Sequence, residues 1–202
     1  MKIFCVGRNY AAHAQELNND LPDNPLIFMK PSTAILHKDR DFYIPDFSNN
    51  IHYEAELILK IAKNGKSIEP KFASKYISAI TVGLDFTARD LQDQLKKNGH
   101  PWEIAKAFDG SAVIGEWQDV RHYQPADTSF SLDINGVKVQ QGNTTMMLFS
   151  FDKIISYISR FFTLQTGDLI FTGTPAGVGA IKCGDVLEGF LENEKVLECK
   201  IK

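Results

Sequence analysis

Cysteine is scarce in this 202-residue chain, and long apolar runs are missing. Cys5, Cys183 and Cys199 are odd in number and have no CxxC or His-paired zinc spacing, so a disulfide framework is disfavoured and buried, reduced thiols are expected. No run of about eighteen uncharged apolar residues occurs, so no transmembrane helix is predicted. The opening MKIFCVGRNY is also too poor in apolar residues for a signal peptide. We therefore expect a cytoplasmic protein with no membrane partner.

The chain also has no excess of positively charged residues. The formal net charge is -3 and the pI is about 5.9, which gives no electrostatic footprint for nucleic acid. No GxSxG occurs, which argues against an α/β serine hydrolase, and the glycine-rich loop 171–179 has neither the GK[ST] of a phosphate loop nor the GxGxxG of a dinucleotide fold. With 44% hydrophobic residues the chain can bury one sizeable core. We expect a single domain, 1–202, that acts on a small molecule.

Strand patterns are present along the whole chain and helical patterns are few. Short apolar runs predict strands over 2–7 and 77–86 and after Leu164, and Asn-Gly pairs at 64–65 and 135–136 predict tight hairpins. Helices are expected near 69–79, over 88–98 with Thr87 as its cap, and over 151–162. The last of these has an apolar stripe made of Ile154, Ile155, Ile158, Phe161 and Phe162. The pattern favours a β-rich α+β fold with a few outer helices.

Carboxylates occur where an apolar strand would normally carry none. In IHYEAELILK (51–60), strand alternation places Glu54 and Glu56 on one face, and Asp85 ends the apolar strand over 77–86. Glutamate is depleted in strands and neighbouring like charges repel, so the pair needs water, a cation or a shared proton. A solvated strand face and a helix cap at Asp85 are the simpler alternatives. Three oxygen donors in an open arrangement would suit Mg²⁺ or Mn²⁺.

A histidine and a glutamate follow the first strand at helical spacing. In GRNYAAHAQEL (7–17), His13 and Glu16 are three residues apart and would share one face of a short helix. The carboxylate could then orient the imidazole, and the pair could move a proton or activate water. A simple surface ion pair on a helix explains the same spacing.

Two further segments carry candidate binding groups. Lys106 stands in the apolar run PWEIAKAFDG, where it could extend its stem over the core or face an anionic substrate. The loop FTGTPAGVG (171–179) follows a strand, and its hydroxyls and amides could bind a carboxylate. It could equally be a tight turn that needs glycine.

In this order, these segments resemble the fumarylacetoacetate hydrolase family. The resemblance spans nearly the whole chain. Two of its blocks, ARDLQ and PWEIAKAFD, look like the short acylpyruvase, oxaloacetate decarboxylase and fumarylpyruvate hydrolase branch, which has only the catalytic domain. The motifs are GRNYAAHAQEL, KPSTA, HYEAEL, TVGLDFTARDLQ, PWEIAKAFD, NGVKVQQGNT and LQTGDLIFTGTPAGVG.

The resemblance implies a mixed β-sandwich or β-roll, a Mg²⁺ or Mn²⁺ site, and a homodimer. It implies metal ligation by Glu54, Glu56 and Asp85, and a catalytic dyad of His13 and Glu16 on a segment that closes as a lid. Lys106 would be a catalytic, substrate-facing cation. Further substrate contacts would come from Arg8, Gln92 and Thr174.

The implied substrates are 2-oxo and β-diketo acids, and more than one reaction stays open. Hydrolysis of a carbon–carbon bond in an acylpyruvate would release pyruvate, whereas decarboxylation of oxaloacetate needs no attacking water, and isomerisation of a 2-oxo-enoate needs only proton transfer. A catalytically silent module that binds such acids is the alternative outside the enzymes. Tyr53, where close relatives often carry histidine, and the proline-free SAVIG (111–115) depart from the family pattern and bear on the substrate.

Overall fold

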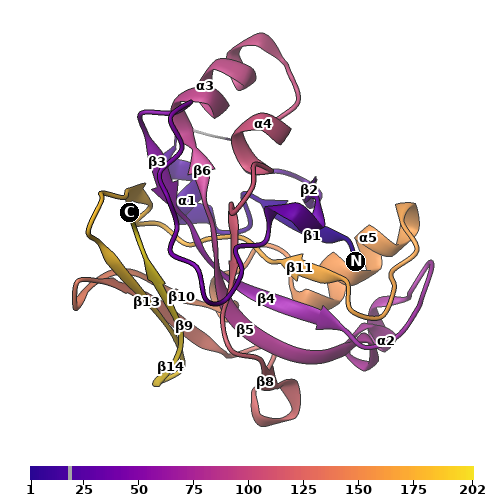
Figure 1. The fold of residues 1–202 in the computed structure, drawn as a ribbon. Coiled ribbons are helices and arrows are strands. Elements are labelled where there is room, and N and C mark those ends of the chain that lie inside the picture. Colours follow the sequence, from indigo (N-terminus) through magenta and orange to yellow (C-terminus); the bar gives the residue numbers. More distant parts are fainter. Residues whose placement is uncertain (18–19) are drawn as a thin grey trace.

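The computed structural model describes residues 1–17 and 20–202, whose strands form three sheets (Figure 1). The predicted polar stretch 18–25 lies partly outside these residues. The largest sheet has the order β2-β1-β11-β4-β5-β7, with β8 also paired to β5. Only the β1–β11 pair of this sheet is parallel, so the sheet is mixed. Its strands are β1 (Ile3–Gly7), β2 (Leu26–Lys30), β4 (Ala55–Ile61), β5 (Ile77–Asp85), β7 (Ala112–Ile114), β8 (Gln118–Asp119) and β11 (Leu169–Phe171).

A four-stranded antiparallel sheet packs against β5, and a small sheet extends the molecule toward α3 (Figure 1). The first has the order β10-β9-β13-β14 and the second β12-β3-β6. Apolar residues of the large sheet and of β9, β13 and β14 join in one core, which confirms the β-rich α+β prediction, with a mixed sheet packed on an antiparallel one. The strands are β9 (Ser129–Ile134), β10 (Val137–Asn143), β13 (Val186–Leu191), β14 (Glu194–Lys200), β3 (Ile51–Tyr53), β6 (Thr87–Ala88) and β12 (Gly179–Ala180).

The helices are short and lie at the edges of the sheets. Two predicted helices need correction. The helix expected over 69–79 ends at Ala73, because Ile77 already pairs with Ile61 at the start of β5. Thr87 does not cap α3, since it belongs to β6 and its hydroxyl donates to the carbonyl of Asp85. The helices are α1 (Ala11–Glu16), α2 (Pro70–Ala73), α3 (Arg89–Asn98), α4 (Glu103–Lys106) and α5 (Phe151–Phe161).

The apolar stripe of α5 is shorter than predicted. Ile154, Ile155 and Ile158 are fully buried, but Phe161 and Phe162 are 56% and 37% exposed. The helix ends at Phe161, so these two rings lie at its end, where Phe162 packs on the core residue Phe4 with ring centroids 5.3 Å apart but stays partly exposed. Three of the five predicted core residues are therefore core residues.

One of the two predicted Asn-Gly hairpins is present. Asn135 and Gly136 have φ of 53° and 77° and join β9 to β10, as predicted. Asn64-Gly65 forms no such turn, because Gly65 pairs with Leu164 far along the chain. Glycine is needed at 65 for space, since a Cβ there would lie 2.4 Å from the ring of Tyr76.

The cysteines are all free, but they are not all buried. Cys5 and Cys199 lie in the core as expected, whereas Cys183 is exposed, which corrects the prediction for that thiol. Among the helices described, none is both long and apolar enough to cross a membrane.

Candidate active site

Three carboxylates meet where the chain passes from the small sheet into the large one. The predicted single strand over 51–60 is two strands of different sheets, and Glu54 lies at the break between them. The amide of Asp85 donates to the carbonyl of Glu54 at 2.8 Å, which fixes the end of β5 beside the break. One carboxylate oxygen each from Glu54, Glu56 and Asp85 lie within 4.8 Å of one another. The structure thus brings together the three predicted metal ligands.

These carboxylates are buried, so neither the solvated strand face nor the helix cap applies. Glu54, Glu56 and Asp85 are 4%, 3% and 0% exposed. Lysine partners offset part of their charge. The Nζ atom of Lys106 lies 2.6 Å from Glu54 and 2.8 Å from Asp85, and Nζ of Lys30 lies 2.8 Å from the other oxygen of Asp85. Lys106, itself 3% exposed, is therefore a buried member of the site rather than a lysine whose stem covers the core.

Glu56 is the carboxylate that no cationic side chain contacts in the described part of the chain. Its Oε2 accepts a hydrogen bond from the amide of Gly173 at 2.7 Å. Burial, together with the charge of Asp85, raises the pKa of Glu56 well above its ordinary value. Burial alone would also raise the pKa of Glu54, but Lys106 and Arg89 outweigh it and lower that pKa. When Glu56 is ionised, no cationic side chain among the described residues therefore contacts it to balance its negative charge.

The donor set fits a hard divalent cation. The Oδ1 atom of Asp85 is buried and accepts no hydrogen bond, although Lys30 lies within ion-pair distance. A cation among the three carboxylates would share Asp85 with Lys30 and would stabilise the ionised form of Glu56. Oxygen ligands of this kind suit Mg²⁺ and Mn²⁺.

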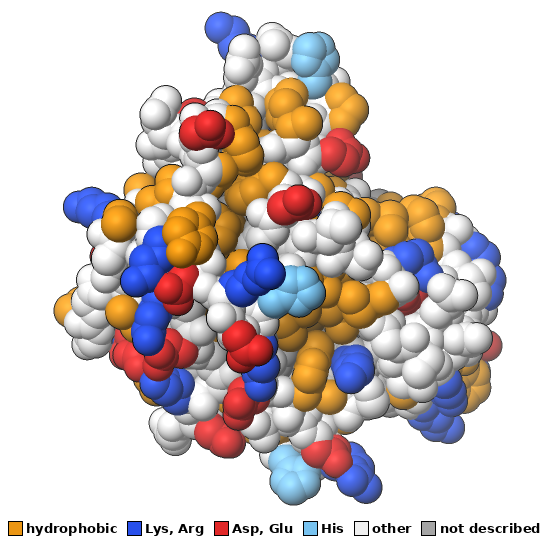
Figure 2. Space-filling view, viewed as in Figure 1, with side chains coloured by type: hydrophobic (Ala, Val, Ile, Leu, Met, Phe, Trp, Pro, Cys, Tyr) orange, Lys and Arg blue, Asp and Glu red, His pale blue; other side chains and the backbone are white. Residues whose placement is uncertain are grey.

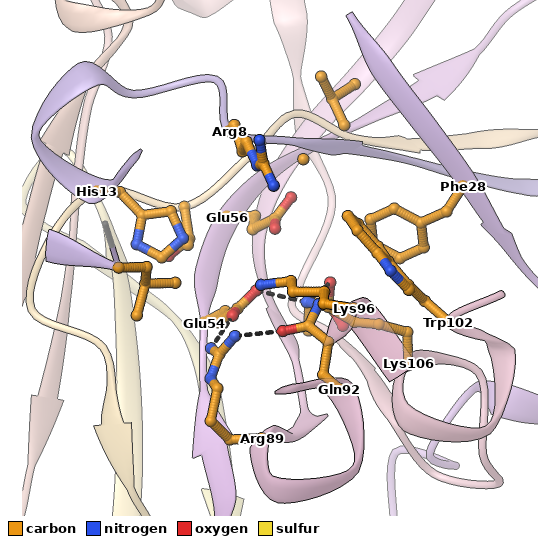
Figure 3. A pocket seen from close by; sticks show the side chains of 15 residues that line it. Arg8, His13, Phe28, Glu54, Glu56, Arg89, Gln92, Lys96, Trp102 and Lys106 are labelled. Carbon is orange, nitrogen blue, oxygen red and sulfur yellow. Dashed lines mark hydrogen bonds and ion pairs between the residues drawn. The ribbon is translucent and has the colours of Figure 1, made fainter. Parts of the chain in front are cut away.

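His13 of the predicted dyad lines the same pocket (Figure 3). Nδ1 of His13 lies 3.4 Å from Oε2 of Glu16, and Glu16 also accepts the amide of Gly177 at 3.1 Å. His13 is buried, and this burial lowers its pKa from 6.5 despite the opposing effects of Glu54 and Glu16. Glu16 is itself exposed but His13 is buried, so the pair is not a simple surface ion pair: Glu16 holds the imidazole, and its contact with Gly177 joins α1 to the loop 171–179.

The amides of this loop bind the protein's own carboxylates. Gly173, at φ +104°, donates to Glu56, and Gly177, at φ +97°, donates to Glu16. Both the tight-turn and the carboxylate-binding interpretations therefore apply, but the carboxylates bound are those of the chain itself.

The remaining predicted substrate contacts all line the pocket. Arg8 enters from the end of β1, Gln92 from α3 and Thr174 from the loop 171–179. Gln92 accepts a hydrogen bond from Arg89, and Oγ1 of Thr174 accepts one from Gln140. These side chains surround the carboxylates (Figure 3).

Several residues in and around the pocket were not singled out from the sequence. Arg89 pairs with Glu54, and Lys30 with Asp85, deep in the site. Both belong to motifs quoted above, ARDLQ and KPSTA, but no spacing rule connects them to the carboxylates. The other residues in this group line the opposite wall and the mouth of the pocket: Phe28, Lys96 and Trp102.

Comparisons with known proteins show the family of the chain. The family model for the fumarylacetoacetate (FAA) hydrolase C-terminal region matches residues 2–202. A mitochondrial oxaloacetate tautomerase of Caenorhabditis elegans is 43% identical over 93% of this chain and 88% of its own length. The structure of fumarylpyruvate hydrolase from Pseudomonas aeruginosa in complex with Mn²⁺ and pyruvate matches with a TM-score of 0.94 and 38% identity, over 100% of this chain and 89% of that one.

A third relative has another activity. The structure of 2-hydroxyhepta-2,4-diene-1,7-dioate isomerase from Mycobacterium marinum matches with a TM-score of 0.86 and 35% identity, over 99% of this chain and 73% of that one. Similarity therefore extends to a tautomerase, a hydrolase and an isomerase. The reactions differ but the fold is shared, and with a family model that covers nearly every residue, this chain belongs to the fumarylacetoacetate hydrolase family.

Proposed function

We propose that this protein is a Mg²⁺- or Mn²⁺-dependent enzyme of small 2-oxo acids, and that oxaloacetate keto–enol tautomerisation is its main reaction. The observation that carries the proposal is the buried carboxylate triad of Glu54, Glu56 and Asp85, with one oxygen that accepts no hydrogen bond. The curated tautomerase from C. elegans, similar over nearly the whole chain, supports the choice of reaction.

The chain's own residues have separate tasks in this reaction. Glu54, Glu56 and Asp85 would hold the cation, which when bound supplies a Lewis acid for charge on the oxygen of the 2-oxo group. Lys106 stabilises the same charge, because its ammonium group lies between Glu54 and Asp85 in the pocket. Arg89 orients Gln92 toward the substrate.

His13 is the proton carrier. With Nδ1 directed to Glu16, Nε2 remains for the substrate, and burial keeps the ring neutral at pH 7. It takes the proton from the enol hydroxyl, and a proton returns to the adjacent carbon, so the keto form results without net change in atoms.

Hydrolysis of acylpyruvates is the second candidate, favoured by the similarity to fumarylpyruvate hydrolase. Here His13 would deprotonate a water that attacks the distal carbonyl. The carbon–carbon bond then breaks, the electron pair stays on the pyruvate fragment as its enolate, and protonation of that enolate gives pyruvate. The same residues thus serve both reactions, and decarboxylation of oxaloacetate would need only enolate stabilisation.

A substrate panel tests the proposal. Enolic oxaloacetate, fumarylpyruvate and acetylpyruvate are offered with Mn²⁺ or Mg²⁺ and again after chelation by EDTA. We expect rapid loss of the enol absorbance of oxaloacetate, abolished by EDTA and restored by metal. Pyruvate release from the acylpyruvates at a higher kcat/KM would make hydrolysis the main reaction. No turnover of any member would favour a silent binding module.

Two features of the whole protein belong to the proposal as well. The family resemblance implies a homodimer, and a cytoplasmic location is part of the proposal, whereas the C. elegans relative is named as mitochondrial. Nucleic acid is not a proposed partner, given the net charge of -3.

A further inference from the structure

Helix α3 presents three polar side chains to the pocket at helical spacing. Arg89, Gln92 and Lys96 stand at positions i, i+3 and i+7 and all line the cavity. The first two are engaged within the protein, because Arg89 pairs with Glu54 and donates to Gln92. Lys96 is the member of this row whose task is not accounted for.

Lys96 is a cation without an ion-pair partner among residues 1–17 and 20–202. Its Nζ lies 5.6 Å from the centroid of the Trp102 ring. Burial, reinforced by the charges of Arg89 and Arg8 and opposed by Asp93 and Glu54, lowers its pKa to about 8. The side chain is therefore still mainly charged at pH 7, and it stands half-buried in the pocket wall.

Arg8 is a second cation at this end of the pocket. It has φ of +57°, a left-handed backbone that is uncommon outside glycine and concentrates at functional sites. The hydrogen bond described for its guanidinium is a long one of 3.4 Å to the carbonyl of Asp20. Figure 3 shows the Arg8 side chain above Glu56, directed into the pocket.

One side wall of the pocket, beside the carboxylates, is aromatic. Phe28 and Trp102 form an edge-to-face pair with ring centroids 6.0 Å apart, and both line the pocket (Figure 3). A carbon chain lying along this wall would have its 2-oxo end at the triad. Its other end would reach the side chains of Lys96 and Arg8.

We propose that Lys96, assisted by Arg8, binds the distal carboxylate of a dicarboxylic 2-oxo acid and so selects diacids over monoacids. This inference rests on the proposed function, because it takes the triad as the site of the 2-oxo end. Carboxylate binding would give Lys96 the charge-assisted hydrogen bond that it lacks among the described residues. The alternative is that Lys96 only packs on Trp102, and such a role would not distinguish diacids from monoacids.

Binding of a matched ligand pair tests this. 2-Oxoglutarate and 2-oxopentanoate share five carbons and differ in a distal carboxylate versus a methyl group. Their Kd values are measured by calorimetry in the presence of Mn²⁺ for the unmodified protein, Lys96→Met, Lys96→Arg and Lys97→Met. Lys97 is the control, since it is the next residue of α3 and is exposed.

In Lys96→Met we expect the Kd of 2-oxoglutarate to rise about tenfold or more, with that of 2-oxopentanoate changed less than about twofold. Lys96→Arg should restore most of the preference, and Lys97→Met should behave as the unmodified protein. Equal changes for both ligands, or none, would overturn the role of Lys96 while leaving the proposed function intact. If the unmodified protein binds neither acid yet turns over oxaloacetate, this inference fails and the proposed function stands. If it also turns over no member of the substrate panel, both fail. Should Lys96→Met not fold, Lys96→Gln takes its place.

Discussion

Glu56 has a buried side chain, a pKa raised by burial and by Asp85, and no cationic side chain in contact within the described residues. Its neighbours Glu54 and Asp85 share Lys106, and Lys30 and Arg89 add further positive charge around them. A buried carboxylate in this position destabilises the fold unless it is protonated or a cation is bound. Glu56 is thus the carboxylate of the triad that a bound cation would stabilise most.

The pH dependence of turnover tests the role of His13. Because burial lowers the pKa of the imidazole from 6.5, the ring is neutral above that pH and gains a proton only in more acidic solution. We predict that kcat/KM for oxaloacetate is constant near pH 7 and falls with decreasing pH, with a midpoint below 6.5. Steady-state assays from pH 5 to 8 measure this.

The matched variant for this profile is His13→Asn, which keeps a polar side chain but cannot carry the proton. We expect kcat to fall by about 100-fold or more and the acidic limb to disappear. An unchanged rate, or the same limb in the variant, would remove His13 from the mechanism.

At the scale of residues, the three carboxylates of the site can be predicted from the sequence, whereas the roles of Lys30 and Arg89 cannot. Glu54 and Glu56 stand out because alternation along a strand puts both on one face, and Asp85 because it ends an apolar run. Lys30 looks like the polar end of a strand, and Arg89 like a first-turn helix residue. Their roles depend on strand and helix placement in space, which local spacing does not encode.

At the scale of elements, the loop 171–179 connects the metal ligands to the dyad, and Gly173 is the glycine of this loop that donates to Glu56. A Cβ at Gly173 would lie 2.7 Å from Cβ of Asn9, and its φ of +104° is unfavourable for other residues. We predict that Gly173→Ala destabilises the protein by more than about 2 kcal/mol and weakens Mn²⁺ binding through Glu56. Denaturant unfolding and metal titration measure the two effects.

Gly167→Ala is the control for backbone strain. Gly167 also has positive φ, +86°, but a Cβ there would meet nothing within 4 Å. Gly167→Ala should lower the free energy of unfolding by only about 1 kcal/mol and leave the affinity for Mn²⁺ unchanged. Equal destabilisation by both substitutions would mean that the contact with Asn9 is unimportant.

Helix α5 allows a second comparison at this scale. Ile158 is fully buried, whereas Phe161 is 56% exposed, although the helical pattern assigned both to one stripe. Ile158→Ala should lower the free energy of unfolding by about 2–5 kcal/mol, and Phe161→Ala by less than about 1 kcal/mol. Urea unfolding monitored by circular dichroism gives both values. A larger loss for Phe161→Ala would contradict the burial pattern.

Local sequence patterns predicted turns and helices correctly only where no distant part of the chain pairs with the same residues. The hairpin at Asn135 and Gly136 formed because β9 and β10 are neighbours in sequence and in space. The turn expected at Asn64 and Gly65 did not form, because the backbone of Gly65 pairs with Leu164 from the other half of the chain. The helix near 69–79 was shortened for a similar reason, the pairing of β5 with β4.

At the scale of the whole molecule, the face seen in Figure 2 carries both hydrophobic and charged side chains. Figure 2 shows hydrophobic side chains gathered at the base of the lobe that carries α3 and α4, with charges of both signs over the rest of this face. From the family resemblance we predict a homodimer, with twice the chain mass of 22.7 kDa. Light scattering after size-exclusion chromatography measures the mass, and a concentration-independent monomer would contradict this prediction.

The central claim is that Glu54, Glu56 and Asp85 hold a divalent cation, and Mn²⁺ titration followed by calorimetry tests it most directly. Glu56→Gln keeps the side chain's size but removes its charge, and Glu116→Gln, at an exposed glutamate, is the matched control. We predict one Mn²⁺ site per chain in the unmodified protein and in Glu116→Gln, and an affinity at least about 100-fold lower in Glu56→Gln. Undiminished binding in Glu56→Gln would contradict the account.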